Sequence, residues 1–307
     1  MTYEIMNANI KSLSLIGTVW FSVSQSLVIR WFNTLGHNID ANTMVLMTEL
    51  CKIAIVSTLC RGWLHKSPFP GPVQWGFAVN ALLYIGTNLL SYVILESIDV
   101  GLYMILIQHK VLLVVGLSSI VLKRSYTRMQ WFACVLLMLG IVLAQYRLNG
   151  AKQSEHPIRT SILVLVVVQG LCSSFSGVWM EKMMKRDDDL DTEPRDPLYD
   201  ILTDSLQMYG FSLPFYVALA SNSFGTHTLP ILPSIFLVIN GACCGLCIGS
   251  IFKYYSAAVR TFVQGATVIL SVWISVVLLN EHLSWGLGFG TVCVVGGIVV
   301  FQRGRQP

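Results

Sequence analysis

A lysine near the middle of a long apolar stretch is the residue most able to do chemistry. Lys110 lies within GLYMILIQHKVLLVVGLSSIVL, residues 101–122, which can cross a bilayer because about 20 helical residues span roughly 30 Å. A lysine at that depth costs about 3 kcal/mol, so it should face a bundle interior or a watery cavity. Its own helix has no acid three or four positions away. We therefore expect a counter-ion from elsewhere, either an anionic substrate or, without substrate, Asp204.

Two further groups of charges lie in or beside apolar stretches. Glu49 and Lys52 are three positions apart, so they share a helical face and can pair. That pair is either purely structural or also lines a substrate path. Lys253 and Arg260 are seven apart around a bend of small residues, and two cations on a common face close to a helix start suit phosphate oxygens. The alternative is that both are ordinary cytoplasmic loop charges.

Aromatic and amide side chains accompany these cations. Tyr84 and Asn88 lie four apart on one helical face, and Tyr103 lies seven residues before Lys110. Aromatic rings stack on nucleobases and amides bind base edges, although both tyrosines equally suit a membrane-interface belt. The small, hydroxylated stretch GLCSSFSGVW, residues 170–179, either packs tightly or leaves room for a ligand.

The composition explains what positions these residues. The chain is 54% hydrophobic and 12% charged, against about 25% charged in soluble domains. This predicts an all-α membrane protein with ten transmembrane helices. The expected spans are about 12–32, 43–61, 73–95, 100–122, 129–146, 160–181, 198–221, 231–252, 258–279 and 284–302. The eight cysteines fall in or at the edges of these spans, where small residues aid helix packing.

The ten spans divide into two related halves. A shift of about 157 positions lays LKRSYTRMQW on LNEHLSWGLG and Gly140 on Gly297. An odd number of spans per repeat gives the copies opposite orientations, as in secondary transporters with inverted repeats. We expect the first five-helix repeat at 1–150, the sixth helix and a charged cytoplasmic connector within 151–197, and the rest of the second repeat at 198–307. The bias of Lys and Arg among the loops places both termini in the cytosol.

Several motifs together resemble the nucleotide-sugar transporter family. They run in order along nearly the whole chain: Thr48-Glu49-x-x-Lys52, Tyr84 with Asn88, Asp99-x-x-x-Tyr103 with Gln108-x-Lys110, Gly177-Val178-x-x-Glu181-Lys182, Gln207-Met208-Tyr209, and Lys253-Tyr254 followed by a cation. Within the drug/metabolite transporter superfamily, they are most similar to the group for CMP-sialic acid, UDP-galactose and UDP-N-acetylglucosamine.

The resemblance implies a Golgi antiporter that imports a pyrimidine nucleotide sugar, UDP- or CMP-linked, in exchange for the nucleoside monophosphate. It implies phosphate binding by Lys110 and a second cation, and nucleoside contacts from tyrosines, an asparagine and a serine. The expected substrate-binding residues are Lys110, Arg260, Lys253, Tyr84, Asn88, Tyr103, Ser173, Tyr209, Glu49 and Lys52. Arg260 stands where the family has a lysine, and Ser256-Ala257 stands where it has Asp-Asn. These departures put the sugar and base specificity in question.

Other functions stay open at this stage. A transporter of the same fold could carry a sugar phosphate or another metabolite. A membrane enzyme acting on lipid phosphates would need a nucleophile or metal ligands at one depth, and the spans offer only scattered acids. We expect no catalytic residue, metal, cofactor or nucleic-acid partner. The sequence leaves open a homodimer, and the endoplasmic reticulum in place of the Golgi.

Overall fold

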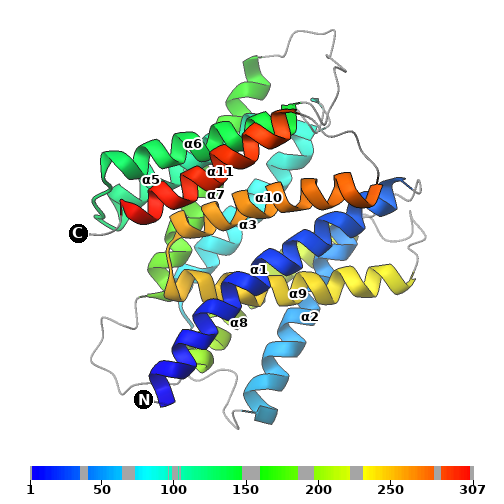
Figure 1. Cartoon of the computed structure of the whole chain (residues 1–307). Coiled ribbons are helices and arrows are strands. Elements are labelled where there is room, and N and C mark those ends of the chain that lie inside the picture. Colours follow the sequence, from blue (N-terminus) through cyan, green and yellow to red (C-terminus); the bar gives the residue numbers. More distant parts are fainter. Residues whose placement is uncertain are drawn as a thin grey trace. The chain divides into compact units, whose positions relative to one another are not determined.

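The chain is helical wherever its structure is described. The computed structural model describes residues 2–34, 41–63, 73–95, 97–98, 103, 105–146, 160–185, 197–221, 231–279 and 285–304, and these ranges contain no strand. The helices are α1 (Thr2–Thr34), α2 (Ala41–Thr58), α3 (Trp75–Leu95), α5 (Lys110–Val121), α6 (Arg128–Tyr146), α7 (Thr160–Met184), α8 (Pro197–Ser221), α9 (Ile231–Tyr254), α10 (Ala257–Leu279) and α11 (Trp285–Arg303) (Figure 1). A π-helical turn, η1 (Leu59–Trp63), follows α2, and a 3₁₀ turn, η2 (Ile107–His109), precedes α5.

Hydropathy and length confirm an all-α membrane protein. Seven of the described helices are long and apolar enough to cross a membrane, namely those in α1, α2 with η1, α3, α7, α9, α10 and α11. Two further apolar helices, Ile107–Val121 and Arg128–Ala144, are shorter. Most of the expected charged connector, residues 186–196, lies outside the described residues.

The chain folds into two compact units that are not its two halves. Unit 1 contains residues 1–82 and 180–256, and unit 2 contains residues 83–179 and 257–307. The chain passes from one unit to the other within α3, within α7 and between α9 and α10. Each unit therefore combines helices from both predicted repeats.

In unit 1, α9 packs along α1 and α2, and α8 packs on α2. Small residues allow this close approach, because a Cβ atom on Gly17 of α1 would lie 2.9 Å from the Cys247 sulfur of α9. Polar contacts add to the packing. Asn240 of α9 donates from Nδ2 to the Phe21 carbonyl at 2.7 Å and accepts from the Ser24 hydroxyl at 2.9 Å.

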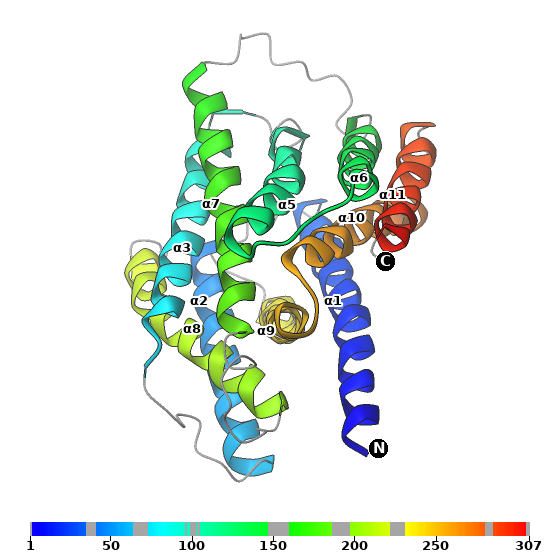
Figure 2. The ribbon, with the colours of Figure 1, turned by 90° about the vertical axis from the view of Figure 1, so that its left-hand side faces the viewer.

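In unit 2, α6 and α11 lie side by side (Figure 1, Figure 2). A Cβ atom on Gly140 would lie 2.8 Å from the Gly290 carbonyl oxygen, and one on Gly297 would lie 3.1 Å from the Ala133 carbonyl oxygen. Since the later residue of α6 meets the earlier residue of α11, the two helices run antiparallel. Glycine at these positions lets the two backbones touch.

Candidate functional site

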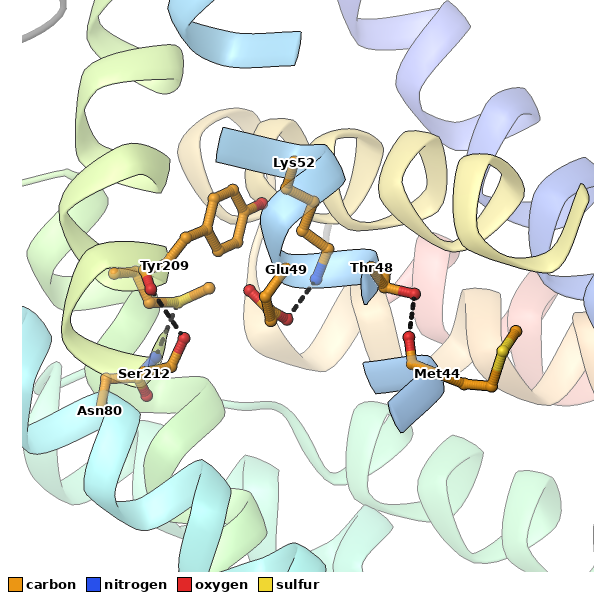
Figure 3. Close-up of polar contacts among 8 residues, drawn as sticks. Met44, Thr48, Glu49, Lys52, Asn80, Tyr209 and Ser212 are labelled. Atoms are coloured by element: carbon orange, nitrogen blue, oxygen red, sulfur yellow. Dashed lines mark hydrogen bonds and ion pairs between the residues drawn. The ribbon is translucent and has the colours of Figure 1, made fainter. Parts of the chain in front are cut away.

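In unit 1, Glu49 and Lys52 of α2 form the ion pair that their spacing predicts. The Lys52 ammonium lies 2.7 Å from Glu49 Oε1 (Figure 3), and both side chains are buried. The lysine stem lies against α9, where a Cβ atom on Gly245 would be 2.6 Å from Lys52 Cε. Gly245 thus makes room for the buried cation.

Tyr209 of α8 joins this pair. The Lys52 ammonium lies 4.8 Å from the centre of the Tyr209 ring, which is within the range of a cation–π interaction. Tyr209 is 1% exposed and packs in an apolar cluster with Val56, Leu202 and Leu206. The structure therefore brings together three predicted site residues, Glu49, Lys52 and Tyr209, which lie near one another in Figure 3.

Glu49 keeps one acceptor unused. Its Oε2 atom is buried and has no hydrogen-bond partner among the described residues. A buried carboxylate oxygen without a partner is costly, so this atom can accept a further hydrogen bond. The predicted alternative, in which the ion pair also lines a substrate path, has this feature in its favour.

In unit 2, Lys110 has a different environment. It is half-buried at the first residue of α5, and Arg260 in the first turn of α10 is close enough for the two positive charges to repel each other. The described part of unit 2 contains no aspartate or glutamate. Lys110 accordingly forms no salt bridge within the described part of this unit. An anionic ligand could therefore neutralise its charge.

Lys253 and Arg260 do not share one helical face. Helix α9 ends at Tyr254 and α10 begins at Ala257, so the two cations lie on different helices and in different units. The expectation of a common face is wrong because the helical repeat is interrupted at Tyr255-Ser256. Lys253 is buried at the end of α9, while Arg260 keeps the expected place near a helix start.

Tyr103 is anchored inside unit 2. Its hydroxyl lies 2.7 Å from Gln169 Nε2 and 3.2 Å from the Ser91 hydroxyl. Its ring packs in an apolar cluster with neighbours that include Ile107 and Val166. A side chain that is 9% exposed and anchored in this way does not behave like a residue of a membrane-interface belt.

The remaining predicted residues of unit 2 lie on α3 and α7. Tyr84 is 45% exposed, so an interface role remains open for it, and Asn88 is half-buried one turn later. Ser173 is half-buried on α7. Its neighbour Ser174 contacts the Lys110 segment, donating to the Lys110 carbonyl at 3.3 Å.

The sequence reasoning missed two residues that contact these side chains, namely Gly245 and Gln169, whereas Ser174 lies in the small, hydroxylated stretch 170–179 that the sequence singled out. Gln169 had a detectable signal, because it is an amide that directly follows the apolar run ILVLVVV within an expected span, and polar groups inside membrane helices need partners. Gly245 had none, since small residues are common wherever membrane helices pack.

Comparison with known proteins identifies the family. A model described as nucleotide-sugar transporter matches residues 6–192, which is more than half of the chain. This chain belongs to the nucleotide-sugar transporter family. The predicted family is thereby confirmed, and because its members are transporters, the chain is not an enzyme. The alternative of a membrane enzyme acting on lipid phosphates is therefore set aside.

Individual relatives of this transporter align over most of its length. CMP-sialic acid transporter 4 of Arabidopsis thaliana is 26% identical over 304 residues, covering 92% of this chain and 82% of the relative. The mouse UDP-galactose translocator is 27% identical over 312 residues, covering 96% of this chain and 79% of the relative. The UDP-galactose/UDP-N-acetylglucosamine transporter srf-3 of Caenorhabditis elegans is 27% identical over 235 residues, covering 73% of this chain and 60% of the relative.

A solved crystal structure has a similar fold. It matches this transporter with a TM-score of 0.66 and covers 95% of this chain and 98% of that chain. The sequence identity is 16%, so the likeness concerns the fold alone.

Proposed function

We propose that this transporter is a Golgi antiporter that imports a pyrimidine nucleotide sugar and returns the matching nucleoside monophosphate to the cytosol. Lys110 and Arg260 bind the phosphates in this proposal. Tyr84, Asn88, Tyr103, Ser173 and Tyr209 contribute to nucleoside recognition, and Glu49, Lys52 and Lys253 line the substrate path. Both termini face the cytosol.

One observation carries the proposal. Lys110 and Arg260 repel each other in a unit whose described part has no acidic side chain. Two cations close to each other favour a ligand with negative charge, and phosphate oxygens accept charge-assisted hydrogen bonds from both ammonium and guanidinium groups. Both ligands of the proposed exchange carry such a phosphate.

The names of the relatives support a pyrimidine nucleotide. The Arabidopsis relative is named for CMP-sialic acid and the mouse relative for UDP-galactose. Cytosine and uracil are both pyrimidines, so we extend this class to the present transporter. The sugar is left undefined, because Arg260 and Ser256-Ala257 depart from the family pattern near the phosphate-binding cation.

The packing of α6 on α11 supports two inverted repeats of five spans, at 1–150 and 151–307. The shift that aligns Gly140 with Gly297 also aligns Ala133 with Gly290. Gly140 meets Gly290, and Ala133 meets Gly297, so exchanging equivalent residues turns one contact into the other. That is the relation expected across a two-fold axis, and inverted repeats are related by such an axis in the membrane plane.

The same charges explain how exchange is coupled. An empty carrier that reorients must close around the Lys110 ammonium, which has no acidic partner in the described part of unit 2, and burying a cation without an anion costs several kcal/mol. A bound phosphate removes that cost in either direction. A ligand shifts a conformational equilibrium only through such differences in affinity, so the nucleotide sugar and the monophosphate both permit reorientation and the empty site resists it.

Reconstituted vesicles test the proposal. The purified protein is placed in liposomes loaded with UMP, CMP or AMP, and the uptake of labelled UDP- and CMP-sugars is measured. We expect uptake only against the monophosphate that carries the same pyrimidine base, and loss of uptake in Lys110→Met. Arg128→Met is the matched control, because Arg128 is an exposed cation of the same unit, and it should retain exchange. Normal exchange by a folded Lys110→Met protein would overturn the assignment.

A further inference from the structure

The segment that carries Lys110 is held from outside its own helix. The 3₁₀ turn η2 directly precedes Lys110, whose backbone N–H bonds to the Ile107 carbonyl. Hydrogen bonds in 3₁₀ turns have poorer geometry than those in α-helices, and such turns often mark hinges. The direction of the Lys110 side chain therefore depends on what holds the segment between Tyr103 and Lys110.

Helix α7 supplies the first contact through Gln169. This buried amide donates from Nε2 to the Tyr103 hydroxyl at 2.7 Å and to the Thr87 carbonyl of α3 at 3.2 Å, and it also contacts the Ser91 hydroxyl. Gln169 thus fixes the start of the segment and links it to α3.

The second contact is steric and lies at Gly170. A Cβ atom on Gly170 would lie 2.7 Å from His109 Cε1, so the imidazole ring occupies the space that any other residue would fill. His109 is itself fixed, because its Nδ1–H donates to the Leu106 carbonyl at 2.8 Å. Its Nε2 atom is buried and has no hydrogen-bond partner in the described part of the chain, which leaves close packing on Gly170 as its constraint.

The third contact reaches Lys110 itself. Ser174, which is 1% exposed, donates from Oγ to the Lys110 carbonyl at 3.3 Å. The bond holds the backbone and leaves the ammonium available to a ligand. Gly170 and Ser174 lie one helical turn apart on one face of α7, so one face of the helix meets two consecutive residues, His109 and Lys110.

From these three contacts we infer that Gln169, Gly170 and Ser174 are positioning residues that aim Lys110 at the phosphate of the ligand. The inference rests on the proposed function, because it takes Lys110 as the phosphate-binding residue. It predicts that changes at Gly170 and Ser174, which contact His109 and Lys110, weaken phosphate binding without changing recognition of the nucleoside.

The test compares ligands with and without phosphate. Dissociation constants of UMP, CMP, uridine and cytidine are measured with the purified full-length protein carrying Ser174→Ala or Gly170→Ala. Loss of one hydrogen bond should weaken monophosphate binding by about 3- to 10-fold, and Gly170→Ala should weaken it more. Gly86→Ala is the matched control, since a Cβ atom there meets nothing within 4 Å, and it should bind like the wild type.

The same changes are repeated in Lys110→Met. If α7 acts through Lys110, Ser174→Ala and Gly170→Ala cause no further loss in that background, and nucleoside binding stays constant throughout. Equal losses for nucleosides and monophosphates, losses that persist in Lys110→Met, or no loss at all would overturn the inference. Lys110→Met alone separates the two proposals: if it leaves the preference for monophosphate over nucleoside unchanged, the proposed phosphate site is wrong, and the positioning role fails with it.

Discussion

Lys52 in unit 1 and Lys110 in unit 2 are both lysines within apolar helices, but their surroundings differ. Lys52 is buried, lies 2.7 Å from Glu49 Oε1 and faces the Tyr209 ring. Lys110 is half-buried, is repelled by Arg260, and lies in a unit whose described part contains no acid. A lysine that is already neutralised serves the stability of the protein. A lysine that lacks a counter-ion is suited to bind an anion, at some cost to stability.

The largest expected effect comes from breaking the neutralised pair. Lys52→Ala leaves the Glu49 carboxylate buried without its cation, and we expect the free energy of unfolding to fall by about 3–5 kcal/mol. Thermal unfolding in detergent measures this loss. The double change Glu49→Gln with Lys52→Met removes both charges and should recover most of the stability. If Lys52→Ala alone melts like the wild type, Lys52 does not stabilise the protein by neutralising Glu49, and the proposed difference from Lys110 is wrong.

A smaller effect tests the space that unit 1 provides for its cation. Gly245→Ala places a methyl group against the Lys52 stem, and overpacking of this kind costs about 1–3 kcal/mol. Gly210→Ala in the same unit is the control, because a Cβ atom there has no neighbour within 4 Å and alanine favours a helix by about 0.5–1 kcal/mol. The two variants should therefore shift the melting temperature in opposite directions. Equal shifts would show that the Lys52 stem can move aside.

Lys110→Met should give a change opposite in sign to Lys52→Ala. Removing one of two repelling charges should raise the free energy of unfolding of the ligand-free protein by about 1 kcal/mol. In the wild type, a monophosphate at 100 times its dissociation constant adds about 2.7 kcal/mol, and the variant should lose that increment. Thermal unfolding with and without UMP or CMP measures both. A variant that is less stable without ligand would indicate that Lys110 has a neutralising partner after all.

The smallest expected effect comes from replacing Arg260, the second cation, with a lysine. Arg260→Lys keeps the charge, so the stability should change by less than about 0.5 kcal/mol. A lysine cannot bind phosphate through two parallel N–H groups as arginine does, so affinity for the monophosphate should fall a few-fold. Titration calorimetry checks this prediction. Stronger binding by the variant would mean that Arg260 does not contact the phosphate.

The sequence by itself determined what depends on spacing and composition. The apolar segments predict the all-helical membrane fold, because crossing a bilayer requires about 20 apolar residues in a helix. The spacing of Glu49 and Lys52 predicts their pair, because residues three apart lie on one face. Ordered motifs along the chain identified the family, as the match over residues 6–192 confirms.

Only the tertiary structure decided which distant side chains meet. Tyr103 and Gln169 are far apart in the chain, and no local pattern predicts that the amide reaches the hydroxyl. The interruption between α9 and α10 separates Lys253 from Arg260, although their spacing suggested one face. The charge balance of each unit also arises only in three dimensions. The chain changes units within α3 and α7, so the residues that can neutralise a buried lysine are set by packing rather than by neighbours in the sequence.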